Sequence, residues 1–172
     1  MKKKMSVKEQ NIINAKKAHK DSIKYLYFGR YLMVRYCTTA LLFANLFWLI
    51  FCFPYHNNAL LGIILALIMT IYAAGVAIEQ LSKMHNRKPD IPITRVYLLV
   101  QIFVNFILGI SVLTPLRKYL LPFITDASST WVIEGILLIG VLLCIICEVR
   151  INNIIDGKDK YLRVINTFKK NN

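Results

Sequence analysis

Four stretches of the chain are nearly free of charged residues, and they decide the fold class. They cover about residues 34–54, 59–80, 95–114 and 131–148. Each approaches or exceeds the roughly 20 residues that an α-helix needs to cross the ~30 Å hydrocarbon core of a bilayer. The pattern therefore predicts an all-α integral membrane protein with four transmembrane helices, which we expect to form two antiparallel hairpins. The first hairpin is expected to be tight, because only about four residues separate its spans.

The two ends of the chain have a different pattern, in which apolar residues recur every three or four positions between lysines. This spacing predicts amphipathic helices. We therefore divide the chain into a basic amphipathic segment over 1–30, a transmembrane domain over 31–150 and a basic amphipathic tail over 151–172. Both end segments are expected to lie on the cytoplasmic membrane surface, as such helices commonly do. Docking onto a protein partner is the alternative use of the same surfaces.

The basic residues predict the orientation in the membrane. Ten Lys and Arg residues precede the first span, four lie between spans two and three, and six follow span four, whereas only Arg117 and Lys118 lie in the remaining loops. Cytoplasmic loops are the ones that retain basic residues. Both termini are therefore expected in the cytoplasm. The net charge of +13 is then explained by topology and by contact with anionic headgroups, and we expect no nucleic-acid partner.

The amino-acid composition predicts in which membrane the protein resides. Hydrophobic residues make up 56% of the chain, and the spans leave too little sequence for a separate soluble domain. Lys, Ile and Asn are common whereas Gly is scarce, which is typical of proteins from AT-rich genomes. With no transit peptide in view, we expect the plasma membrane of a bacterium.

Polar residues inside the spans are the first candidates for function, because polar groups in lipid are costly and face protein or a cavity. Span three carries Tyr97, Gln101 and Asn105 at four-residue spacing, which places them on one helix face. Asn45 in span one and Glu134 in span four complete the set. These five residues are predicted to line a groove for a ligand or a partner's helix. Interhelical hydrogen bonds that only pack the bundle are the alternative.

Charged residues near the inner ends of the spans form the second candidate set. Arg35, Glu79, Arg95 and Glu148 each lie close to the predicted cytoplasmic boundary. Their alternating signs predict a ring of charge that pairs across the helices. Simple placement at the interface, with no functional role, is the alternative.

Other chemistry has little support in the sequence. Cys144 and Cys147 are three residues apart, but near the end of a span rather than at a helix N-terminus, where redox thiolates are stabilised. His19, His56 and His85 fall in three separate regions and make no metal set. No glycine-rich phosphate loop and no catalytic triad is present. We therefore expect no cofactor, no bound metal and no catalytic residues.

Three classes of function fit these observations. The first is a small non-enzymatic accessory protein, either an interaction subunit of a membrane transport or secretion system or an immunity-type protein that shields a membrane target. The second is a small carrier or flippase that acts as a homo-oligomer through the polar face of span three. The third, a membrane enzyme, would need Glu134 or Glu79 as its catalytic carboxylate.

Overall fold

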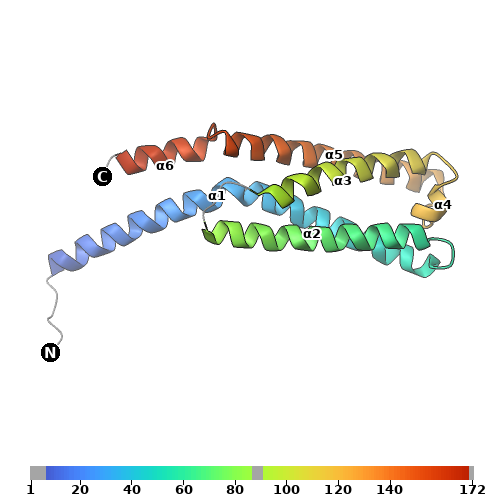
Figure 1. The fold of residues 1–172 in the computed structure, drawn as a ribbon, viewed down its shortest axis with the longest axis horizontal. Helices are drawn as coiled ribbons and strands as arrows, with labels where there is room; N and C mark the ends of the chain where they lie inside the picture. Colours follow the sequence, from blue (N-terminus) through green and yellow to red (C-terminus); the bar gives the residue numbers. More distant parts are fainter. Residues whose placement is uncertain (1–6, 87–90, 171–172) are drawn as a thin grey trace, which may run out of the picture.

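The computed structural model describes residues 7–86 and 91–170, and every regular element within them is helical. The elements are α1 (Val7–Cys52), the short 3-10 helix η1 (Phe53–Tyr55), α2 (Leu60–Asn86), α3 (Pro92–Val112), α4 (Arg117–Leu120), α5 (Ala127–Ile155) and α6 (Lys160–Lys170), as Figure 1 shows. Four helical segments are long and apolar enough to cross a membrane: Phe28–Tyr55, Leu60–Ser82, Pro92–Val112 and Ala127–Thr167. The prediction of an all-helical chain with four helices of membrane-spanning length is confirmed.

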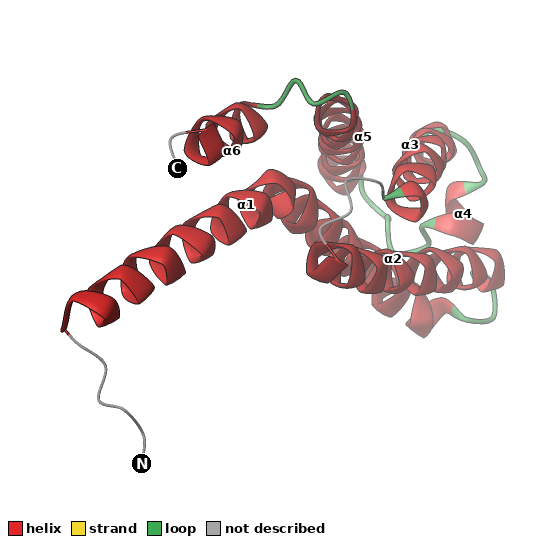
Figure 2. Cartoon of the chain, turned by 60° about the vertical axis from the view of Figure 1, so that its left-hand side comes forward, coloured by secondary structure: helices red, strands yellow, loops and turns green. Residues whose placement is uncertain are grey.

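The first helix is longer than a membrane span requires. It runs for 46 residues without a break, through the boundary drawn at residue 30 between the end segment and the transmembrane domain. Figures 1 and 2 show that its N-terminal half and α6 extend beyond one end of the helix bundle. Residues 1–6 and 171–172 of the two predicted end segments lie outside the described residues, as do residues 87–90 between α2 and α3.

The four long helices pack in two principal pairs. α1 packs mainly against α2 and α3 mainly against α5, while α1 also touches α5 and α2 touches α3. The inward face of α2 carries Ala66, Met69, Ala73 and Val76, which are buried at three- and four-residue spacing. Large apolar residues on the other faces, such as Phe103 on α3, remain exposed. Helices that are apolar on all sides are expected where lipid, not water, surrounds the bundle.

The connection between α3 and α5 folds back onto the first two helices. The backbone oxygens of Tyr119 and Leu120 lie 2.9 and 2.8 Å from the position that a Cβ atom would take at Gly62. The indole N–H of Trp48 donates a hydrogen bond of 3.0 Å to the carbonyl of Leu120. A glycine is needed at position 62 because any side chain there would push α4 away. These three contacts hold α4 against α1 and α2.

The joint between α5 and α6 is a well-defined turn. Gly157 adopts φ +67°, a left-handed conformation that glycine tolerates and that commonly ends helices. The Gly157 N–H donates to the Ile154 carbonyl at 3.2 Å, and the Lys158 N–H donates to the Asn153 carbonyl at 3.0 Å. These are the two hydrogen bonds of a Schellman motif. The motif ends α5 and lets α6 begin at Lys160.

Candidate functional site

A chain of hydrogen-bonded polar side chains runs through the interior of the bundle. The Asn45 amide nitrogen donates to the Tyr97 hydroxyl at 3.1 Å and to the Gln101 side-chain oxygen at 2.9 Å. The Gln101 amide nitrogen in turn donates to the Asn105 side-chain oxygen at 2.9 Å. All four residues are buried. The three α3 side chains, which lie at four-residue spacing, therefore face the interior of the bundle. Asn45 contacts them from α1.

The residues of this hydrogen-bonded series also contact the other two long helices, α2 and α5. On α2, the ring of Tyr72 meets that of Tyr97 edge to face, with 5.2 Å between their centroids. On α5, a Cβ atom added to Gly140 would lie 2.6 Å from the Asn105 amide nitrogen. The absence of a side chain at Gly140 is thus what makes room for Asn105. Four neutral polar side chains thus link α1 to α3 by hydrogen bonds and lie in contact with α2 and α5.

Glu134 of α5 lies near this chain but is not bonded to it. Its Oε1 atom is 3.2 Å from the position that a Cβ atom would take at Gly109, one helical turn beyond Asn105 on α3. Its Oε2 atom is buried and has no hydrogen-bond partner among the described residues. Glu134 therefore extends the polar face of α3 toward α4, with one carboxylate oxygen still able to accept a hydrogen bond.

Two of the four residues predicted for the charge ring form an ion pair. The Arg95 guanidinium donates to the Glu148 carboxylate at 3.1 Å, which links α3 to α5 in a partly exposed position. No ion pair of the Arg35 side chain is found within residues 7–86 and 91–170. The structure thus brings Arg95 and Glu148 together and places Glu79 in a different role.

Glu79 caps the start of α3 from the end of α2. Its carboxylate accepts hydrogen bonds from the backbone N–H groups of Ile93 and Thr94 at 3.1 and 2.7 Å, and from the Thr94 hydroxyl at 2.8 Å. The first turn of a helix has N–H groups without partners inside the helix, and a negative charge there is stabilising. Residue Ile91, at the N-cap position itself, provides no side-chain cap. Glu79 of α2 provides the missing side-chain cap for α3.

A buried ion pair at the end of the bundle from which α1 and α6 extend was not predicted from the sequence. Arg30 of α1 donates to both carboxylate oxygens of Asp159, at 2.9 and 2.7 Å, and to the Ile154 carbonyl at 3.2 Å. The Asp159 side chain is 0% exposed and also accepts from the Leu162 N–H, so it caps α6. The available signal was Gly157 followed by an acidic residue, which is typical of one helix ending and another starting.

The arrangement offers little for cofactor or metal chemistry. In the part of the chain that the structure describes, no three His, Cys, Asp or Glu side chains are grouped to hold a metal ion. Cys144 and Cys147 are buried free thiols. What the interior does provide is neutral hydrogen bonding between helices and, beside it, the partly buried carboxylate of Glu134.

Comparison of the chain with protein-family models, curated proteins and solved structures gives no match.

Proposed function

We propose that this chain is a small non-enzymatic multi-pass membrane protein that acts through interaction with another membrane protein. It would serve as an accessory subunit of a transport or secretion system, or as an immunity-type protein. One observation carries the proposal. The polar side chains best placed to line a path, Asn45, Tyr97, Gln101 and Asn105, are buried and bonded to one another. In this proposal the bundle holds the protruding segments, the first half of α1 and all of α6, in position.

Those ends supply the docking surface in this proposal. The first half of α1 and all of α6 extend past the bundle (Figure 1), and the pair between Arg30 and Asp159 fixes one to the other. On α6, Ile165 is buried while Tyr161 and Val164 stay exposed. A partner would therefore meet a surface of defined shape, and the lysines of α1 would rest on anionic headgroups.

The experiment is extraction of the native complex in mild detergent, followed by measurement of its mass and composition. We compare the full chain, a chain without residues 1–24, and a chain in which residues 7–24 are scrambled with their net charge kept. Stoichiometric partner subunits are expected with the full chain and with neither variant. If the scrambled chain keeps the partner, contact with lipid charge explains the role of the segment. If the truncated chain keeps it, docking through α1 is refuted.

The orientation belongs to the same proposal. We place both termini in the cytoplasm of a bacterium, with α1–α2 and α3–α5 as two antiparallel hairpins and amphipathic end helices on the inner surface. The distribution of Lys and Arg along the chain supports this. In a cysteine-free background, Asn57→Cys and Ser128→Cys should react with an impermeant maleimide on intact cells, and Lys160→Cys only after lysis. Reaction of Lys160→Cys on intact cells would reverse the topology.

A carrier or flippase that works as a homo-oligomer is the second candidate, and one observation favours it. The unpartnered Oε2 atom of Glu134 lies beside the polar face of α3. Vesicles that contain the protein and a fluorescent phospholipid test this, because dithionite bleaches only the outer leaflet. The protein would speed complete bleaching, and Gln101→Leu with Asn105→Leu would abolish the effect. Bleaching that stops at the outer leaflet excludes the flippase.

A further inference from the structure

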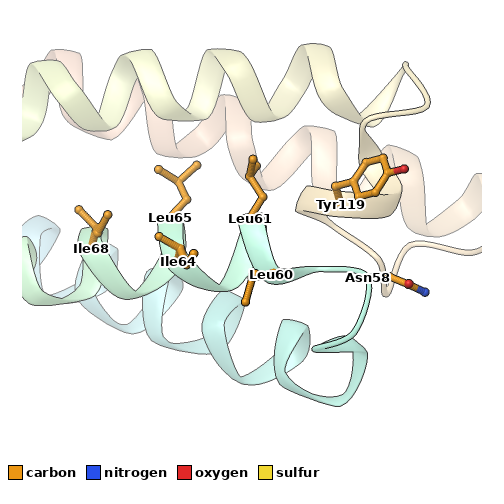
Figure 3. Close-up of a pocket in the computed structure, with 7 residues that line it drawn as sticks. All are labelled: Asn58, Leu60, Leu61, Ile64, Leu65, Ile68 and Tyr119. Carbon is orange, nitrogen blue, oxygen red and sulfur yellow. The ribbon is translucent and has the colours of Figure 1, made fainter.

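An apolar groove runs along α2 at the end of the bundle where α4 lies. It encloses about 630 Å³ and is lined on α2 by Leu60, Leu61, Ile64, Leu65 and Ile68. Asn58, in the loop before α2, and Tyr119 of α4 stand at one end of the groove (Figure 3). Figure 3 also shows Leu61 and Leu65 rising from α2 toward α3. The groove therefore has an apolar wall along α2, and the polar side chains of its lining stand only at the end marked by Asn58 and Tyr119, which we call its mouth.

The length of the groove limits what can occupy it. Eight residues of α-helix separate Leu60 from Ile68, which corresponds to about 12 Å at 1.5 Å per residue. One leaflet contributes about 15 Å, half of the ~30 Å hydrocarbon core. A partner's transmembrane helix would need a contact surface along both leaflets. A single acyl chain, running inward from the surface, matches the groove.

Apolar contact alone would not select a lipid, because an acyl chain is equally well surrounded by other chains in the bilayer. The feature that would select an anionic lipid lies beside the mouth of the groove. Arg117 and Lys118 immediately precede Tyr119 on α4, and they are the two basic residues outside the predicted cytoplasmic segments. Among the described residues, neither side chain takes part in an ion pair. Both charges therefore remain available to an anion at the membrane surface.

The position of these charges is fixed by backbone contacts. The carbonyls of Tyr119 and Leu120 close onto Gly62 of α2, and Trp48 binds the Leu120 carbonyl. Gly62 lies between the groove residues Leu61 and Ile64 in the sequence. The backbone that carries the basic pair is thus held at one end of the groove.

We propose that α2 and α4 together form a binding site for one anionic phospholipid of the leaflet on the α4 side. Its phosphate contacts Arg117 and Lys118, the hydroxyl of Tyr119 and the amide of Asn58 lie at the headgroup level, and one acyl chain occupies the groove. Tyrosine at this depth is typical of membrane interfaces. This site differs from the contact of the lysine-rich chain ends with the opposite leaflet.

The test uses photoreactive lipids. The full chain is placed in phosphatidylcholine vesicles with a small fraction of phosphatidylglycerol that carries a diazirine in its acyl chain, or of phosphatidylcholine with the same label. After illumination, labelled residues are mapped by mass spectrometry. Labelling by the anionic probe is expected to concentrate between residues 60 and 68 and to exceed labelling by the zwitterionic probe about thirtyfold, as two near-surface cations would produce.

Variants separate the site from general contact with lipid. Arg117→Gln with Lys118→Gln should make the two probes equal, and Leu61→Trp should reduce labelling of the groove by either probe. Lys158→Gln with Lys160→Gln removes two charges at the other end of the molecule and should change nothing. Equal labelling by both probes in the unaltered chain would overturn the proposal. Cross-linking of two chains through Leu61→Cys, with loss of groove labelling, would assign the groove to a second copy and overturn it too.

Discussion

Two glycines determine how closely segments approach one another in this bundle. At Gly62 the neighbours are backbone oxygens of α4, and at Gly140 the neighbour is the side-chain amide of Asn105. Backbone cannot give way without moving a whole segment, whereas a side chain can rotate at the cost of its own hydrogen bonds. The same substitution to alanine should therefore have different consequences at the two positions.

Gly62→Ala should displace α4 and lower the free energy of unfolding by about 1–3 kcal/mol, the usual cost of overpacking. The new Cβ atom would lie 2.8 Å from the Leu120 oxygen, which also accepts the Trp48 hydrogen bond. Thermal unfolding in detergent measures the stability, and the fluorescence of Trp48 in a Trp131→Phe background reports the displacement. Gly75→Ala is the control on the same helix, because a Cβ atom at Gly75 has no neighbour within 4 Å. Equal stability losses at both positions would contradict the close contact.

Gly140→Ala should disturb the polar chain without moving a helix. The Cβ atom would come within 2.6 Å of the Asn105 amide nitrogen, and rotation of that amide breaks its bond with Gln101. We expect a loss of roughly 0.6–2 kcal/mol, the range for a hydrogen bond between membrane helices. Gly135→Ala on the same helix, which has open space around it, should have no such cost. Because both changes act on the same contact, Asn105→Ala should make Gly140→Ala almost neutral, and fully additive losses would refute the coupling.

At the scale of a helix, the beginning and end of each element depend on partners far away in the sequence. Glu79 caps α3 from α2, and Arg30 holds the residue that caps α6. The spacing of Tyr97, Gln101 and Asn105 on α3 was readable from the sequence, because it follows the helical period. The partners of Glu79 and Arg30 were not, because they depend on how the helices pack.

The pair between Arg30 and Asp159 should control whether α6 stays attached. Asp159→Ala removes both the α6 cap and the partner of a buried guanidinium, and breaking a buried ion pair typically costs about 3–5 kcal/mol. We expect amide hydrogen exchange over residues 160–167 to accelerate strongly while exchange in α3 and α5 is unchanged. Asp156→Asn breaks an exposed pair with Lys158 and should have an effect near zero. Unchanged protection of α6 in Asp159→Ala would show that apolar contacts alone hold it.

At the scale of the molecule, the apolar pattern predicted four helices of membrane-spanning length, because lipid imposes one length and one composition on every span. The continuity of α1 through residue 30 did not follow from that pattern. Amphipathic and apolar stretches differ in period and composition, but nothing in either marks a break in the backbone. The fold of the connection between α3 and α5 was equally hard to predict, because the close approach of α4 depends on one glycine within an otherwise ordinary apolar run.

The contacts that hold α4 against α1 and α2 have a consequence for the continuity of the chain. α4 belongs to the second half of the sequence and contacts the first half at Gly62 and Trp48. Toward the other end of α2, Glu79 accepts hydrogen bonds from the start of α3. The two halves are thus held together toward both ends of the bundle by contacts other than the peptide link between them. Residues 1–88 and 89–172, made as separate polypeptides, should assemble and co-purify. Gly62→Ala should weaken this assembly and Gly75→Ala should not, and fragments that never associate would show that the covalent link is essential.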